Sequence, residues 1–241
     1  MERTIDLNCD IGESYGAWSM GDDDALLDVV SSANVACGFH AGDPSIIDAT
    51  VRAAAERGVA IGAHPSYPDL AGFGRRSMNL SPQDVESAVL YQIAALAGVA
   101  RANGAALHHV KPHGALYNDA ARNAQLAEAI ARAIARFDTT LLLVGLPDSA
   151  LIAAGKAAGL RTAGEGFCDR AYEPDGSLRS RLRDGAVFTD PEQAAHQAVL
   201  LARSERVKTL CIHGDTPGAP RIALAVCAAL RDAGFALARV A

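Results

Sequence analysis

The chain has 241 residues, of which 50% are hydrophobic and 21% charged, and its formal net charge is -6. This length suits one domain with a large core, so we expect a single domain over residues 1–241. The absence of a basic block argues against a nucleic-acid partner, and no window of about 20 residues is free of charges, which argues against a membrane span.

Short apolar runs alternate with longer helical patterns along the chain. Strands are expected near residues 4–9, 33–38, 59–64, 106–111, 140–145, 160–165 and 209–214. Helices are expected near residues 22–31, 44–57, 82–103, 119–136, 148–158, 191–204 and 219–233. This alternation predicts a parallel α/β fold, and both a closed barrel and an open doubly wound sheet fit the count. We expect the closed form, a (β/α) barrel of about seven strands.

Several helix boundaries are marked by capping residues and glycines. Asp43, Ser81 and Asp190 each precede a proline, so each is expected to cap a helix whose first position is that proline. Glycines expected just past helix ends are Gly58, Gly104, Gly159 and Gly234.

The start of the chain and the cysteines indicate where the protein resides. The first ten residues, MERTIDLNCD, lack the basic and apolar regions of an export signal. The five cysteines are scattered, odd in number and never spaced C-x-x-C. We therefore expect reduced thiols and a cytoplasmic protein.

Two nucleotide-binding motifs are missing, and one segment is irregular. No G-x-G-x-x-G follows the first strand and no G-x-x-x-x-G-K-[ST] occurs, so this chain has no recognisable phosphate loop. Residues 169–185, DRAYEPDGSLRSRLRDG, contain a turn signal and four arginines. We expect a hairpin or lid with an arginine-rich arm; a solvated surface excursion is the alternative.

Ionisable residues gather at the carboxyl ends of the predicted strands. In the first strand Asp6, Asn8 and Asp10 share one face, and in the fourth His109 and Lys111 do. Such groups are costly to bury without partners, and in a parallel barrel these strand ends converge on one mouth. We therefore expect one cavity to be surrounded by Asp10, His40, His64, Lys111, His113, Glu165 and Asp215.

Six segments occur in order along nearly the whole chain, from Asp6 to about Pro217. They are DLNCDIGESYG, NVACGFHAGDP, GAHPSYPDLAGFGRR, VKPHGALYN, EGFCDRAYEPDGSL and IHGDTP. Together they resemble the family of 5-oxoprolinase A subunits, also called the LamB/YcsF family. The resemblance implies a seven-stranded (β/α) barrel of the glycoside hydrolase/deacetylase type. It also implies ATP-dependent opening of 5-oxo-L-proline to L-glutamate, together with two further subunits, B and C.

The chemistry of that reaction suggests roles for several residues. Phosphorylation of the lactam oxygen would activate the ring carbon toward water, and we assign ATP use to the partner subunits because this chain has no phosphate loop. Asp10 and Asp215 are the candidate general bases and the expected partners of Lys111. Lys111 would stabilise an oxyanion or a phosphate. His113 would transfer a proton, and His64 and His213 are further candidates for that role.

Other residues of the mouth are candidates for holding the substrate. Arg75 or Arg76 is expected to bind a carboxylate or phosphate, but two adjacent arginines cannot both face one pocket. The full set of candidate substrate-binding residues is Asn8, His64, Arg75, Glu165 and His213.

Two alternatives from other functional classes remain open. A metal-dependent deacetylase or amidohydrolase of a carbohydrate or small amide would use Asp10, His40 and His64 as ligands of a divalent ion. A non-catalytic scaffold subunit would only bind B and C. The dense polar mouth argues against the scaffold, because interface cores are depleted in charge.

Overall fold

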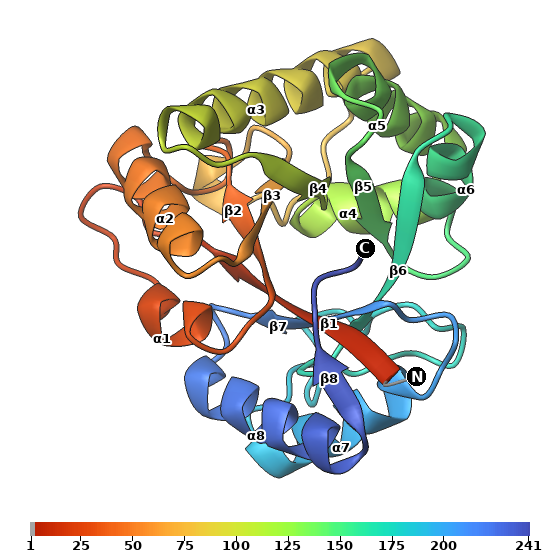
Figure 1. Ribbon diagram of the computed structural model, residues 1–241. Coiled ribbons are helices and arrows are strands. Elements are labelled where there is room, and N and C mark those ends of the chain that lie inside the picture. Colours follow the sequence, from red (N-terminus) through yellow and green to blue (C-terminus); the bar gives the residue numbers. More distant parts are fainter. Residues whose placement is uncertain (1–2) are drawn as a thin grey trace.

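Seven parallel strands close into a barrel in a computed structural model that describes residues 3–241. The strands are β1 (Arg3–Ile11), β2 (Ser32–Ala36), β3 (Ala60–His64), β4 (Leu107–Val110), β5 (Leu142–Gly145), β6 (Arg161–Phe167) and β7 (Thr209–His213). They are hydrogen-bonded in chain order, and β1 closes the ring by pairing with both β2 and β7 (Figure 1). The predicted barrel is confirmed, and the open sheet is excluded.

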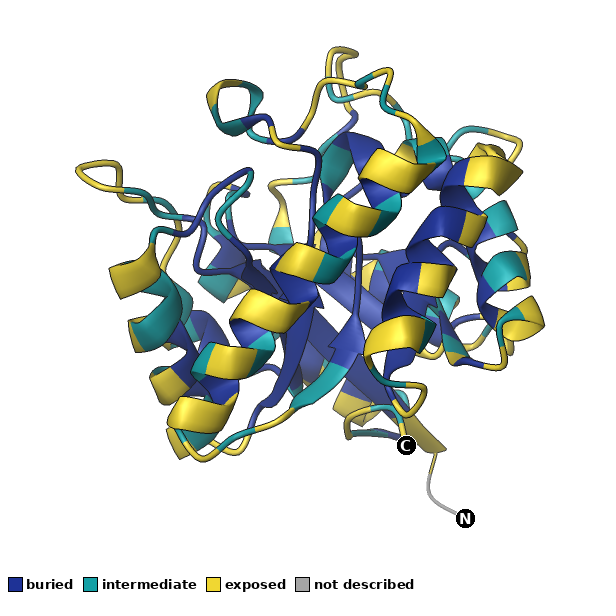
Figure 2. Cartoon of the chain, turned by 90° about the horizontal axis from the view of Figure 1, so that it is seen from above, coloured by how far each residue is buried: buried dark blue, intermediate teal, exposed yellow. Residues whose placement is uncertain are grey.

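The helices form the outer layer of the barrel. They are α1 (Asp23–Leu27), α2 (Pro44–Glu56), α3 (Pro82–Ala102), α4 (Gly114–Arg122), α5 (Ala124–Phe137), α6 (Ala150–Ala157), α7 (Pro191–Ala202) and α8 (Ala219–Asp232), with a 3-10 turn, η1 (Leu70–Gly72). The helices in view in Figure 2 turn their exposed faces outward and their buried faces toward the strands. Among residues 3–241, none of the helices has the length and apolarity needed to cross a membrane.

The predicted caps are confirmed, but one predicted helix is wrong. Asp43, Ser81 and Asp190 accept hydrogen bonds from backbone N–H groups in the first turns of α2, α3 and α7. The region 119–136 was expected to be one helix and is two, because α4 ends and α5 begins at Asn123. The side chain of Asn123 caps α5 by accepting from the N–H groups of Gln125 and Leu126 at 3.0 and 3.3 Å.

An eighth strand at the carboxyl end was not predicted from the sequence. β8 (Phe235–Leu237) pairs in parallel with the start of β1, so it lies outside the closed ring. The chain then turns inward, and Val240 packs against Leu142, Val144 and Ala163. In Figure 1 the carboxyl terminus accordingly lies within the ring of strands. This end of the barrel is filled, so the opposite end, where the strands finish, is the one available to a ligand.

The inward face of β1 is polar, as its alternation predicts. Ile5, Leu7 and Cys9 pack in the main hydrophobic core. On the opposite face, Asp6 accepts hydrogen bonds from the hydroxyls of Ser31 at 2.6 Å and Ser32 at 2.7 Å. Burial raises the pKa of Asp6 even though these hydrogen bonds oppose the shift. Higher in the barrel, a second polar layer carries the candidate site.

Candidate active site

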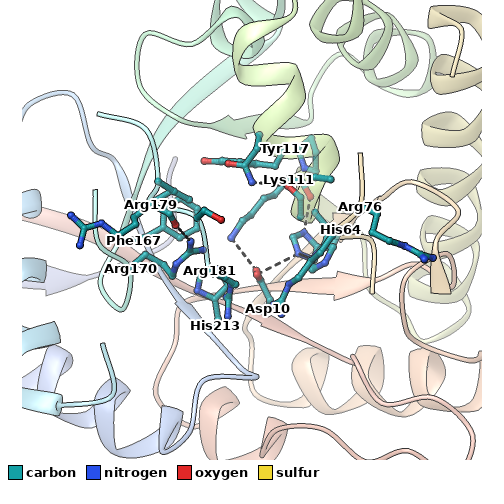
Figure 3. Close-up of a pocket in the computed structure, with 18 of the residues that line it drawn as sticks. Asp10, His64, Arg76, Lys111, Tyr117, Phe167, Arg170, Arg179, Arg181 and His213 are labelled. Atoms are coloured by element: carbon teal, nitrogen blue, oxygen red, sulfur yellow. Dashed lines mark hydrogen bonds and ion pairs between the residues drawn. The ribbon is translucent and has the colours of Figure 1, made fainter. Parts of the chain in front are cut away.

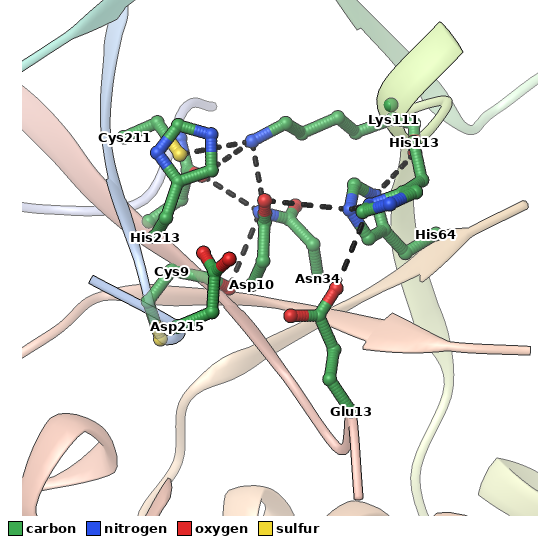
Figure 4. A network of polar contacts seen from close by, with 12 residues as sticks. Cys9, Asp10, Glu13, Asn34, His64, Lys111, His113, Cys211, His213 and Asp215 are labelled. Carbon is green, nitrogen blue, oxygen red and sulfur yellow. Dashed lines mark hydrogen bonds and ion pairs between the residues drawn. The ribbon is translucent and has the colours of Figure 1, made fainter. Parts of the chain in front are cut away.

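Lys111 lies at the centre of the polar layer, immediately after β4, and is almost completely buried. Its Nζ lies 2.9 Å from Asp10 Oδ1, 2.8 Å from Glu165 Oε1 and 3.0 Å from Cys211 Sγ (Figure 4). Burial opposes the charge, but the surrounding groups, Asp10 first, raise the pKa of Lys111 well above its usual value. The ammonium therefore stays charged, and its side chain is held on three sides.

Asp10 is ionised, and Asp215 is not a partner of Lys111. Burial would raise the pKa of Asp10, but His64 and Lys111 outweigh it and lower that pKa well below the usual range. The expected pairing of Lys111 with Asp215 is wrong. Asp215 lies two residues beyond β7, where its carboxylate pairs with Arg75 at 2.7 Å and lies 3.6 Å from Arg181.

The two adjacent arginines have different partners, although both line the cavity, so the expectation that only one of them could face it is wrong. Arg75 packs over the ring of Phe73, with its guanidinium carbon 4.8 Å from the ring centre, and carries the ion pair to Asp215. Arg76 instead pairs with Asp69, and its side chain is 67% exposed. In Figure 3 the Arg76 side chain points away from Asp10.

Three histidines and one glutamate form a second buried cluster beside Asp10. The rings of His40 and His113 stack with centres 3.8 Å apart, and His64 Nε2 lies 3.0 Å from His113 Nδ1. Glu13 Oε1 lies 3.1 Å from His40 Nε2 and 3.5 Å from His113 Nδ1. One ligand atom from each of these four residues lies within 4.8 Å of those of the others, which is close enough to hold a metal ion.

Burial controls protonation in this cluster. It lowers the pKa of His40 and His113 well below the usual value, and neighbouring imidazoles add to the effect, so both rings are neutral. Burial also raises the pKa of Glu13 well above its usual value, with a further contribution from ionised Asp10. The pKa of Asp10 is thus lowered and that of Glu13 raised, and such opposite shifts of neighbouring carboxyl groups are typical of functional sites.

His213 forms a carboxylate–imidazole pair with Asp169. Its Nδ1 lies 2.9 and 3.1 Å from the two carboxylate oxygens, and its backbone N–H donates to the same group at 3.1 Å. Thr216 donates to Asp169 as well, at 2.6 Å. Because Nδ1 is held by Asp169, the other ring nitrogen, Nε2, is available for proton transfer at the cavity, which His213 lines.

A cavity of about 530 Å³ opens above these groups. Its wall is completed by residues 178–182, which belong to the segment predicted to be a lid (Figure 3). Arg170 anchors this segment by donating to the carbonyls of Ala186 at 3.2 Å and Arg179 at 2.6 Å. The side chain of Tyr117 closes another part of the wall. Arginines lining the cavity are Arg75, Arg76, Arg122, Arg170, Arg179 and Arg181.

The structure brings the predicted residues together, although not all of them face the cavity. Those that line it are Asp10, His64, Arg75, Lys111, His113 and His213. Asn8 and Glu165 lie beneath Lys111, where Asn8 donates to Glu165 at 3.1 Å, and His40 stacks behind His113. Glu13 and Phe73 were given no role in advance. Of the predicted metal ligands, His40 and His64 belong to the four-residue cluster, whereas Asp10 lies 3.4 Å from His64 and pairs with Lys111.

Solved structures similar to this chain fall into two groups. The crystal structure of a lactam utilization protein from Thermus thermophilus is 48% identical, covers 98% of this chain and 100% of its own, and superposes with a TM-score of 0.91. A family 4 carbohydrate esterase from Streptomyces lividans is 12% identical, covers 99% and 93% of the two chains, and has a TM-score of 0.57. At that identity the second likeness concerns the fold alone.

Proteins similar in sequence carry the name of a 5-oxoprolinase subunit. The A subunit of 5-oxoprolinase from Methylococcus capsulatus is 56% identical over 92% of this chain and 90% of its own length. The A subunit of 5-oxoprolinase from Bordetella pertussis is 53% identical over 98% of this chain and 99% of its own. The sequence model of the LamB/YcsF family matches residues 5–241, and the chain therefore belongs to the LamB/YcsF family.

Proposed function

We propose that this chain is the ring-opening subunit of an ATP-coupled 5-oxoprolinase, which converts 5-oxo-L-proline to L-glutamate together with subunits B and C. The names of the relatives support the assignment, as does the lactam utilization protein of the same fold. The observation that carries it is the arginine-lined cavity over a charged lysine and an imidazole with one free nitrogen. Such a cavity suits an anionic substrate that must be hydrolysed.

Recognition of the substrate is assigned to the arginines. Both 5-oxoproline and its phosphorylated form carry negative charge, and a guanidinium can bind a carboxylate or phosphate through two N–H groups. Arg181 can supply such a donor, because its buried Nη2 forms no hydrogen bond within residues 3–241 and only an ion pair with Asp215 at 3.6 Å. Arg75 pairs with the same carboxylate, that of Asp215, so it lies on the same side of the cavity as Arg181.

The reaction requires two waters and one leaving phosphate. A partner subunit transfers the phosphoryl group from ATP to the lactam oxygen, which makes the ring carbon electrophilic. Water adds to that carbon, the carbon–nitrogen bond breaks, and the nitrogen takes a proton, leaving a γ-glutamyl phosphate. A second water releases inorganic phosphate and yields glutamate. ATP use is assigned to the partners because the chain has no recognisable phosphate loop.

Three side chains are given roles in these steps. His213, oriented by Asp169, takes a proton from the attacking water and delivers it to the ring nitrogen. Lys111 stabilises the negative charge that develops on oxygen, as a fixed point charge in a buried site. Asp10 is a weak base because its pKa is lowered, so its role is to orient Lys111 and His64.

Reconstitution with subunits B and C tests this function. Glutamate and ADP are measured in the same sample, with 5-oxoproline and ATP as substrates. We expect glutamate to form only when this chain is present, and Arg181→Gln to raise KM by about tenfold or more. The control is Arg52→Gln, an exposed arginine on α2, which should behave as the wild type.

Two results would contradict the proposal. Glutamate release at the full rate without this chain would assign the chemistry to the partners and reduce this chain to a scaffold. Release of acetate from an N-acetylated sugar by the chain alone, without activity on 5-oxoproline in the complex, would favour the deacetylase alternative.

A further inference from the structure

We propose that Glu13, His40, His64 and His113 form a binding site for one divalent transition-metal ion of the zinc class. The inference goes beyond the proposed function, which assigns no metal, and stands independently of it. The set differs from the one expected from the sequence by including Glu13 and His113 and by leaving Asp10 outside.

The orientation of two histidine rings favours a bound cation. His64 Nδ1 lies 2.7 Å from the carbonyl oxygen of Lys111, and His113 Nε2 lies 2.9 Å from the carbonyl oxygen of Phe73. A carbonyl only accepts, so each of these nitrogens carries the proton. The remaining nitrogens, His64 Nε2 and His113 Nδ1, then face each other with their lone pairs at 3.0 Å. Two acceptors at this distance repel each other unless a cation lies between them, and that cation is either a shared proton or a metal ion.

The spacing of the ligand atoms is close to that of a zinc site. Zinc–nitrogen bonds of about 2.0–2.1 Å place tetrahedral ligands about 3.3–3.4 Å apart. Here the two facing imidazole nitrogens are 3.0 Å apart, and Glu13 Oε1 lies 3.5 Å from His113 Nδ1 and 3.1 Å from His40 Nε2. His64, His113 and Glu13 therefore reach one ion with small shifts, whereas His40, whose ring stacks on that of His113 at 3.8 Å, has to rotate to direct its nitrogen at the same ion.

The charge of Glu13 also favours a bound cation. Glu13 is buried, and within residues 3–241 its salt-bridge partners are the imidazoles of His40 and His113, with no arginine or lysine among them. Figure 4 shows its carboxylate directed at the histidine rings. His40 Nδ1 is also buried without a partner in the described chain. Ionising a buried carboxyl that has no arginine or lysine partner is costly, and a divalent ion bound between Glu13 and the histidines would supply the missing positive charge.

The loop carrying Phe73 and Gly74 holds this arrangement in place. Phe73 adopts a left-handed backbone conformation (φ 54°), which is rare for an aromatic residue and aims its carbonyl at His113. A Cβ on Gly74 would lie 2.9 Å from both His40 Cβ and His113 Cδ2, so only glycine fits here. The ring of Phe73 meets the two imidazoles edge-on, at 5.5 and 5.3 Å.

The cluster adjoins the cavity on one side. His64 and His113 line the cavity, whereas Glu13 and His40 lie behind them. Four protein ligands complete a tetrahedral zinc site, so an oxygen entering from the cavity would occupy a fifth coordination position.

Co²⁺ titration of the full chain, first stripped with a chelator, tests the site. We expect the visible absorption bands of four- or five-coordinate Co²⁺ to saturate at one ion per chain, to be displaced by Zn²⁺, and to accompany a rise in melting temperature. Glu13→Gln and His113→Ala should each weaken binding by at least about tenfold. The matched control is His196→Ala, because His196 is an exposed histidine on α7.

Two results would overturn the inference. Without Co²⁺ bands or a shift in melting temperature in the wild-type chain, a proton shared by His64 and His113 explains their contact. A near-ultraviolet thiolate-to-Co²⁺ band that is lost in Cys211→Ser but kept in Glu13→Gln would place the ion at Asp10, Cys211 and His213, a second group with ligand spacing. The wild-type titration is decisive even if a variant fails to fold.

Discussion

Replacing Lys111 with methionine should destabilise the fold and abolish turnover. The ammonium lies 2.9 Å from Asp10 and 2.8 Å from Glu165, and all three side chains are buried. Removing one partner of a buried ion pair costs about 3–5 kcal/mol, because the other charges remain without compensation. For a domain of this size that corresponds to a fall in melting temperature of about 6–20 °C. Glutamate release per folded molecule should fall by about 100-fold or more.

A double-mutant cycle with Glu165→Gln checks the stated cause. The two single variants and the double variant Lys111→Met/Glu165→Gln are unfolded with urea. A chelator is present so that metal binding does not contribute to the measured stability. The double variant should be more stable than the sum of the singles predicts, by about 1–3 kcal/mol, because it leaves one uncompensated carboxylate fewer. Additive effects, or a Lys111→Met variant that melts like the wild type, would refute the reasoning.

Three further predictions concern other parts of the chain. Asn123→Ala removes the cap of α5 and should lower the free energy of unfolding by about 1 kcal/mol in urea, whereas Asn123→Asp should not. Burial raises the pKa of Asp23 from 3.8 to about 6. The folded wild type should therefore lose stability relative to Asp23→Asn as pH rises through that range. A difference in unfolding free energy between the two proteins that stays constant with pH in urea titrations would contradict this. Asp169→Asn should lower kcat for glutamate release by about 100-fold or more with little change in KM, and a change in KM alone would argue against an orienting role.

Strand alternation is a local property, and it predicted the inward residues well. The period of two in β1 and β4 placed Asp6, Asn8, Asp10 and Lys111 on the barrel interior, because side chains of an extended chain must alternate. Closure of the ring then brought these faces together. The barrel and the polar mouth were therefore predictable from short stretches of sequence and the parallel topology.

The period of two does not predict where a side chain points beyond the end of a strand. Most of the wrong or missing site predictions concern residues in such positions. Gly12 has φ +68°, so the chain turns between β1 and Glu13, and parity gives no indication of where Glu13 points. Asp215 likewise follows a turn after β7, and it meets Arg75 instead of Lys111. The left-handed Phe73 is set by its packing against His40 and His113, which no local pattern in the sequence encodes.

The break between α4 and α5 and the short strand β8 were missed for a related reason. The apolar period continues across Asn123, so it could not reveal that the backbone leaves the helix there. β8 has three residues and is defined by its pairing with the start of β1, a contact between the two ends of the chain.

Substitution of His213 in the reconstituted complex tests the central claim most directly. Glutamate and ADP are followed in the same sample for His213→Asn and for the exposed control His196→Asn, after confirming that both chains assemble with subunits B and C. If this barrel opens the activated lactam, His213→Asn should lower glutamate release by about 100-fold or more while the control keeps wild-type turnover. Wild-type glutamate release by the folded, assembled His213→Asn complex would contradict the account.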